Sequence, residues 1–128
     1  MQPVKAAAPG APNAHRNEVA LVGRIAAAPE QRELPSGDLI VVWRLVVERS
    51  ARARTPETSR SATVDTLDCV AWSAGVQRSV TRFAAGDVVA VSGSLRRRFW
   101  RSGAATVSRY EVEVDRVKRL QKAEQQSR

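Results

Sequence analysis

Arginine and aromatic side chains gather in one short run, SLRRRFWRSG, over residues 94–103. A guanidinium group can pair with a phosphate, and a flat aromatic ring can stack on a nucleobase. On a β-strand alternate side chains share a face, so Arg96, Arg98 and Trp100 are expected to point one way. Leu95 continues the apolar face of the same segment, which directs this set outward. The run therefore predicts an open surface that binds a nucleic-acid strand.

The same run also fits a solvated hairpin whose tryptophan packs on the aliphatic stems of its arginines. Trp72, at the end of an alternating segment, is likewise expected to leave the core, either as a stacking residue or as a rim residue. Trp43 shares its parity with Val41 and Leu45. It is therefore expected in the core or against a neighbouring subunit, with Arg44 pointing the other way.

The overall charge supports a polyanionic partner. Lysine and arginine number 21 against 13 acidic residues, a formal net charge of +8. This balance favours nucleic acid before a membrane. No apolar run has membrane-spanning length, and the first 15 residues lack the apolar core of a signal peptide, so we expect a cytoplasmic, nucleoid-associated protein.

The sequence has few residues that could bind a metal, form a disulfide or act in catalysis. Cys69 is the only cysteine and His15 the only histidine, which argues against a zinc site, an intrachain disulfide or a histidine-based catalytic pair. Cys69 is expected to be a small buried side chain, and Asp65, Asp68 and Asp87 to be turn or surface residues. The sequence predicts neither a cofactor nor an enzyme.

Alternating apolar residues predict the elements that position these side chains. Val76, Val80 and Phe83 recur at helical spacing between Ser73, a predicted N-cap, and Gly86, a predicted C-terminal stop. A bulge is expected near residues 108–110, where Tyr110 breaks the alternation. The predicted strands cover residues 17–27, 38–48, 64–72, 88–101 and 105–117.

Five strands with a short helix between the third and fourth predict an all-β fold, the partly open five-stranded OB-fold barrel with a long β-hairpin. Residues 1–15 are expected to form a flexible arm, 16–119 the OB-fold domain and 120–128 a short polar tail. Residues 50–62 carry charges, a proline and no large apolar residue, and they predict a mobile loop.

The opening strand from Asn17 to Gly23, the turn at residues 29–37 and the run GDVVAVSGSLRRRFW resemble the bacterial single-stranded DNA-binding proteins. The resemblance covers about residues 16–118. It implies an OB-fold, a homotetramer, and sequence-independent binding of single-stranded DNA in replication, recombination or repair. It also implies stacking roles for Trp72 and Trp100.

The chain departs from this family at two aromatic positions, where it has Ala51 and Thr66. Nearby arginines are expected to substitute by guanidinium stacking or phosphate contact. Asp68 stands where a basic residue is common, which predicts weaker and more salt-sensitive binding per subunit. The expected DNA-binding residues are Trp72, Trp100, Arg24, Arg32, Arg44, Arg49, Arg52, Arg54, Arg96, Arg98 and Arg101.

The ending AEQQSR is neither acidic nor aromatic, whereas the family's main member ends in an acidic tip that docks replication proteins. The sequence therefore predicts a short paralogue that coats strands, and tail-mediated docking is not expected. Two alternatives stay open: an RNA-binding or primosomal OB-fold module, and an interaction module whose arginine and tryptophan face meets an acidic protein.

Overall fold

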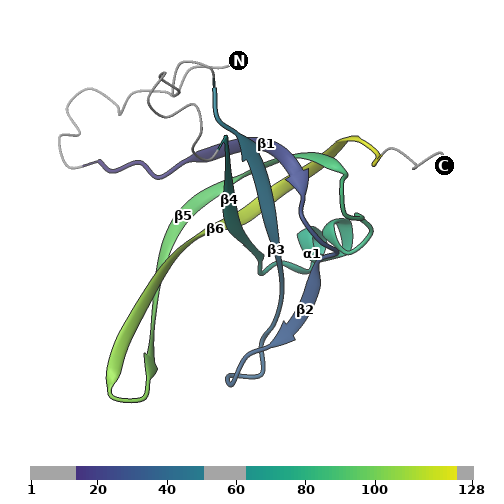
Figure 1. The fold of residues 1–128 in the computed structure, drawn as a ribbon. Coiled ribbons are helices and arrows are strands. Elements are labelled where there is room, and N and C mark those ends of the chain that lie inside the picture. Colours follow the sequence, from purple (N-terminus) through teal and green to yellow (C-terminus); the bar gives the residue numbers. More distant parts are fainter. Residues whose placement is uncertain (1–13, 51–62, 124–128) are drawn as a thin grey trace.

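A computed structural model describes residues 14–50 and 63–123 of the chain. They form strands with one short helix, and no helix in these ranges is long and apolar enough to cross a membrane (Figure 1). The predicted loop, most of the predicted arm, and Arg52 and Arg54 lie outside the described residues. The elements are β1 (Val19–Ile25), β2 (Glu30–Glu33), β3 (Leu39–Glu48), β4 (Val64–Ala71), α1 (Ala74–Val80), β5 (Val88–Ser102) and β6 (Ala105–Gln121).

Five of the strands close into a barrel. The sheet order is β1-β5-β6-β4-β3-β2, and β1 pairs also with β3, where Arg24 lies opposite Val46 and Ile25 opposite Leu45. Only β4 and β6 run parallel. The predicted all-β OB-fold is confirmed, although the barrel is closed and not partly open. The short strand β2 was missed because its four residues are all exposed and show no apolar alternation.

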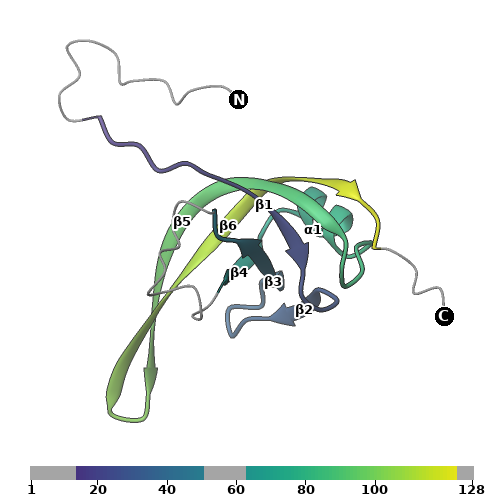
Figure 2. The same cartoon turned by 45° about the horizontal axis from the view of Figure 1, so that its top comes forward.

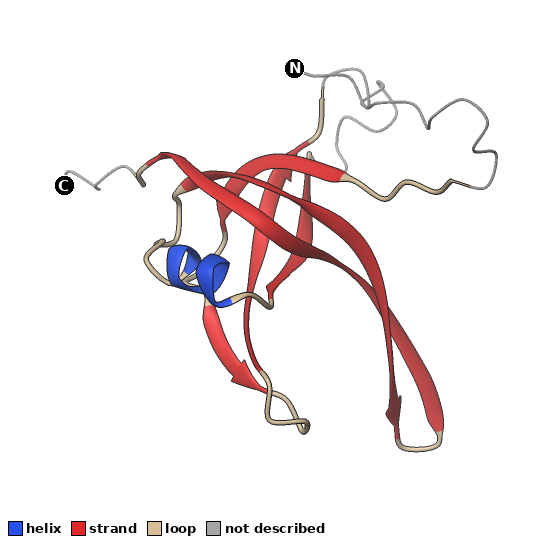
Figure 3. Ribbon diagram, turned by 180° about the vertical axis from the view of Figure 1, so that it is seen from behind, coloured by secondary structure: helices blue, strands red, loops and turns tan. Residues whose placement is uncertain are grey.

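The barrel core is built from the inward-facing residues of the strands, with α1 at one end. Trp43 is 5% exposed and belongs to this core. Of the two predicted positions, the core and a subunit contact, the structure therefore supports the core. Val76 and Val80 bury the inner face of α1 against it. Figure 3 shows the helix beside the barrel, on the end away from the β5–β6 hairpin tip.

The helix begins as predicted and ends earlier. Ser73 is the N-cap, and its Oγ accepts a hydrogen bond from the Val76 N–H at 3.3 Å. The C-cap is Thr81, so the predicted stop at Gly86 is wrong. Beyond the helix, the carboxylate of Asp87 accepts a hydrogen bond from the N–H of Ala84 at 2.9 Å.

Asp87, expected at a turn or on the surface, is buried, and its carboxylate connects the segment after α1 to the end of β6 through hydrogen bonds. Besides Ala84 it accepts the N–H of Ala123 at 2.7 Å and lies 3.5 Å from Nη1 of Arg119. These hydrogen bonds, more than the Arg119 charge, hold the pKa of Asp87 below its usual value of 3.8. Strand β6 also continues to Gln121, past its predicted end at Val117. Residues 120–123 therefore belong to the fold and not to a tail.

Strands β5 and β6 form a hairpin whose outer half extends away from the barrel (Figures 1 and 2). Ser102 pairs with Ala105, and Gly103 has φ of 65°, as the first position of a type II′ turn requires. The predicted bulge near residues 108–110 is wrong, because pairing is regular there and the register shifts lie at Val88/Val89 and Ser92/Gly93. Tyr110 needs no bulge, since at its position the hairpin has already left the barrel.

Gly93 sits at the second register shift, and a side chain there would meet backbone. A Cβ atom on Gly93 would clash with the carbonyl of Glu113 on β6. We expect Gly93→Ala to lower the free energy of unfolding by about 3 kcal/mol, because a backbone contact cannot rotate away. The matched control is Gly75→Ala in α1, where the nearest atom is Arg78 Nη2 at 3.9 Å. That change should raise stability by about 0.5 kcal/mol through helix propensity. Denaturant unfolding of both variants measures this, and equal stabilities would contradict the close approach.

Candidate nucleic-acid interface

An open groove of about 560 Å³ lies between the β2–β3 side of the barrel and the β5–β6 hairpin. Its charged lining comes from five strands, β2 to β6, which bring together residues far apart in the sequence. Four arginines and three carboxylates line it, together with one partly exposed tryptophan. These residues are Arg32, Arg44, Arg98, Arg109, Glu30, Asp68, Glu111 and Trp100.

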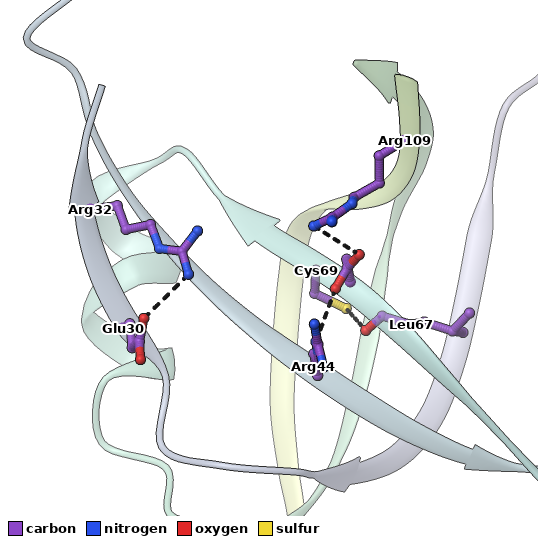
Figure 4. A network of polar contacts seen from close by, with 7 residues as sticks. Glu30, Arg32, Arg44, Leu67, Cys69 and Arg109 are labelled. Atoms are coloured by element: carbon purple, nitrogen blue, oxygen red, sulfur yellow. Dashed lines mark hydrogen bonds and ion pairs between the residues drawn. The ribbon is translucent and has the colours of Figure 1, made fainter. Parts of the chain in front are cut away.

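Asp68 joins two of these arginines. Its Oδ1 lies 3.4 Å from Nε of Arg44, which is directly opposite on β3, and its Oδ2 lies 3.6 Å from Nη1 of Arg109 on β6 (Figure 4). The expectation of a turn or surface residue misses this role. One carboxylate thus orients two cations toward the same groove, and it also offsets part of their charge.

Glu111 provides a second, more buried carboxylate. The residue is 9% exposed, and its Oε2 lies 3.6 Å from Nη1 of Arg98. Burial raises the pKa of Glu111, against the opposing pull of Arg98 and with a further push from the negative charge of Asp68. Removing a carboxylate from water is costly unless a cation accompanies it. Arg98 is therefore held beside Glu111 in the groove.

Trp100 lies on the same strand as Arg98, two residues further along, so both side chains share a face of β5. Trp100 is 42% exposed, and Cζ of Arg109 lies 5.8 Å from its ring centroid. This contact is of cation–π length. At the other side of the groove, Nη2 of Arg32 lies 3.3 Å from Oε1 of Glu30. Figure 4 shows this pair on β2.

The groove brings together four of the eleven predicted binding residues, namely Trp100, Arg32, Arg44 and Arg98. Arg96 pairs instead with Glu113 at 2.9 Å, outside the groove lining. Arg49 pairs with Asp65 at 3.0 Å, immediately after β3. Three further predicted residues are exposed but do not line the groove: Arg24, Trp72 and Arg101.

Sequence reasoning missed Arg109 and Glu111, although a signal was present. Gly103 marks a two-residue turn, and counting outward from it pairs Arg98 with Arg109 and Arg96 with Glu111. Directly paired residues lie on the same face of an antiparallel ladder. The register of the hairpin was therefore readable, and it would have placed Arg109 beside the predicted binding residues.

Cys69, next to Asp68 on β4, is buried as predicted, at 1% exposure. Burial, together with the charges of Asp68 and Glu111, raises the pKa of its thiol to about 12. The thiolate is the reactive form of cysteine. Its place beside the groove therefore carries no nucleophilic chemistry.

Comparisons with known proteins give a consistent result. The model of the single-strand binding protein family matches residues 16–120. A single-stranded DNA-binding protein of Thermotoga maritima is 29% identical over 84 residues, which are 66% of this chain and 58% of that protein. The chain thus spans little more than half of this curated relative. The structure of the Plasmodium falciparum SSB complex with ssDNA matches with a TM-score of 0.70 and 19% identity, over 84% of this chain and 97% of that one, which supports the fold.

The buried thiol yields a simple test of the groove wall. At about pH 8, where an ordinary cysteine reacts readily, Cys69 should be inert toward a disulfide thiol reagent in the folded protein. Denaturant should restore one reactive thiol per chain, since Cys69 is the only cysteine. The reagent releases a coloured thiol when it reacts, and the absorbance of that product measures the reaction of Cys69 in the folded and the denatured protein. Fast reaction of the native protein would contradict the packing of Cys69 described above.

Proposed function

The chain belongs to the single-strand binding protein family, and from this premise we propose that it binds single-stranded DNA without sequence preference. The observation that supports this most is the groove, where Trp100 lies among four arginines. An aromatic platform beside cations suits a strand whose bases are unpaired and whose phosphates are regularly spaced. The only helix in the described residues, α1, packs against the core, so residues 14–50 and 63–123 offer no helix that could read base edges in the groove of a duplex.

In this proposal Trp100 stacks on a base, and Arg98 and Arg109 bind the phosphates beside it. Each guanidinium has five N–H donors, and the distances of these ion pairs are 3.4–3.6 Å, longer than the roughly 2.7–2.9 Å of a strong charge-assisted hydrogen bond. Donors on each guanidinium therefore stay available to phosphate oxygens. The carboxylates therefore orient the arginines without using up their capacity to bind.

The same carboxylates weaken the field in the groove. Four arginines against three carboxylates leave a net charge of +1 in its lining. Asp68 and Glu111 offset part of the positive charge that attracts phosphates, so each groove supplies modest affinity. Residues outside the groove then extend the path of the strand, and we assign this role to Trp72, Arg24, Arg49, Arg96 and Arg101.

We also propose a homotetramer that acts in replication, recombination or repair as a binding protein and not as an enzyme. Family membership supports these roles. Trp43 does not supply a contact between subunits, because it packs in the core of its own barrel. Sedimentation at micromolar concentration separates a tetramer from a 14.0 kDa monomer.

A salt titration tests the function itself. If each of the four groove arginines neutralises one phosphate, log K against log salt should have a slope of about −2.8, because each contact on a single strand contributes roughly −0.7. Affinity for an oligothymidylate of about 5 nucleotides, which fills only the groove, should then fall about 50-fold between roughly 50 and 200 mM salt. A duplex and an RNA of equal length serve as controls. Equal affinity for the duplex would overturn single-strand binding, and tighter binding of the RNA would favour an RNA-binding module.

Two tryptophan variants separate binding from folding. Trp100→Ala should weaken single-strand affinity about tenfold and leave the melting temperature unchanged, since stacking contributes about 1–3 kcal/mol per base. Trp43→Ala should instead lower the free energy of unfolding by about 3–5 kcal/mol, because it empties part of the core. Affinity and melting are measured on both proteins. If Trp100→Ala melts early yet binds normally, Trp100 is a packing residue.

A further inference from the structure

The hairpin has a second face that the groove does not use. Odd-numbered residues of β5 point to the side opposite Trp100 and Arg98. At the outer half of the hairpin this side carries Leu95, Arg97 and Phe99 of β5 and Tyr110 of β6, which we call the back face. Phe99 is 59% and Tyr110 57% exposed, the two most exposed aromatic side chains in the described residues.

Arg97 lies between these two rings. Its Cζ is 4.7 Å from the ring centroid of Phe99 and 5.4 Å from that of Tyr110. Its Nη2 donates a hydrogen bond to Oγ of Ser108 at 3.2 Å, which fixes the guanidinium across the hairpin. Both contacts to the rings are of cation–π length. The back face is therefore an ordered aromatic–cation–aromatic cluster, open to solvent.

The charge of this cluster distinguishes it from the groove. Arg96, Arg98 and Arg109 each have a carboxylate within 3.6 Å. Within residues 14–50 and 63–123, Arg97 has none at ion-pair distance. Its positive charge is thus balanced by no acidic side chain of the described residues, and no carboxylate offsets its attraction for an anion placed beside it.

A second copy of this chain fits the back face poorly. In a symmetric contact the same patch meets itself, so two Arg97 side chains would be brought close together without an acidic partner on this face. Four side chains are also few beside the roughly 20–30 residues per partner of a stable protein interface. A strand of nucleic acid has the complementary chemistry, because it presents flat bases next to anionic phosphates.

We propose that the back face is a second contact for single-stranded DNA, reached by a strand that passes from the groove around the hairpin. Bases stack on Phe99 and Tyr110, and a phosphate between them binds Arg97. The hairpin stands clear of the barrel and is only two strands wide, about 5 Å between strand axes, so one strand can contact both faces (Figure 1). This inference rests on the proposed function of the groove.

The proposal predicts an effect that depends on the length of the strand. A strand that fills only the groove does not reach the back face, whereas a longer one binds there as an intramolecular second step. The double variant Phe99→Ala, Tyr110→Ala should therefore lose about tenfold in affinity for an oligothymidylate of about 16 nucleotides and less than twofold for one of about 5. Arg97→Ala should reduce the salt dependence for the longer strand alone.

Fluorescence anisotropy with the full chain and both oligonucleotides measures these affinities. Leu120→Ala is the matched control, because Leu120 is an exposed apolar residue of β6 (51%) at the opposite end of the strand. Trp100→Ala should weaken binding of both lengths. As a second measurement, a bromodeoxyuridine-substituted 16-mer should photo-crosslink to peptides that contain Phe99 or Tyr110, which mass spectrometry identifies.

The outcomes separate this proposal from the one on which it rests. If Trp100→Ala loses affinity but the double variant loses none at either length, the proposal of a second contact on the back face is wrong and the proposal of DNA binding in the groove stands. Equal losses at both lengths would place the two rings on the primary path and likewise overturn the second contact. A change of sedimentation without a change of affinity would assign the face to contact between copies. A wild-type protein that binds neither oligonucleotide would remove both proposals.

Discussion

The continuous pairing of β5 with β6 is the constraint on which the rest of this structure depends. From Val88 opposite Gln121 to Ser102 opposite Ala105, one ladder serves two purposes. Its inner half closes the barrel wall through core residues such as Val91, and its outer half becomes the free arm that carries Trp100. The change between the two occurs at the register shift beside Gly93, where the absence of a side chain lets the backbones of the two strands approach.

This ladder also decides which charges meet. Because Arg98 lies opposite Arg109, two cations would repel each other across the hairpin. Glu111 and Asp68 lie beside them, and each carboxylate lies within 3.6 Å of at least one of the two arginines. The arrangement keeps a dense set of guanidinium groups ordered on an exposed surface. Its cost is a weaker positive field in the groove, which makes contacts elsewhere on the hairpin more important to a bound strand.

Strand alternation helped to predict the fold, because β1 alternates between less and more exposed residues along its length and the first half of β5 buries every second residue. It was insufficient where burial gives no pattern: β2 is exposed throughout, and the burial of Asp87 depends on Ala123, which lies far along the chain. Tyr110 suggested a bulge because alternation alone does not show where a strand leaves the barrel.

The sequence by itself determined which side chains are available for binding: it has an excess of arginine, and alternation directs Arg98 and Trp100 outward and Trp43 and Cys69 inward. It also carried the resemblance that the family match confirms. These follow from local periodicity and composition, which need no knowledge of distant contacts. Only the tertiary structure decided that Arg32 and Arg44 share one groove with Trp100, that Asp68 links Arg44 to Arg109, and that Arg97 lies between two rings. The grouping of Arg32 and Arg44 with Trp100 depends on strand order and barrel closure, which bring together residues more than 50 positions apart.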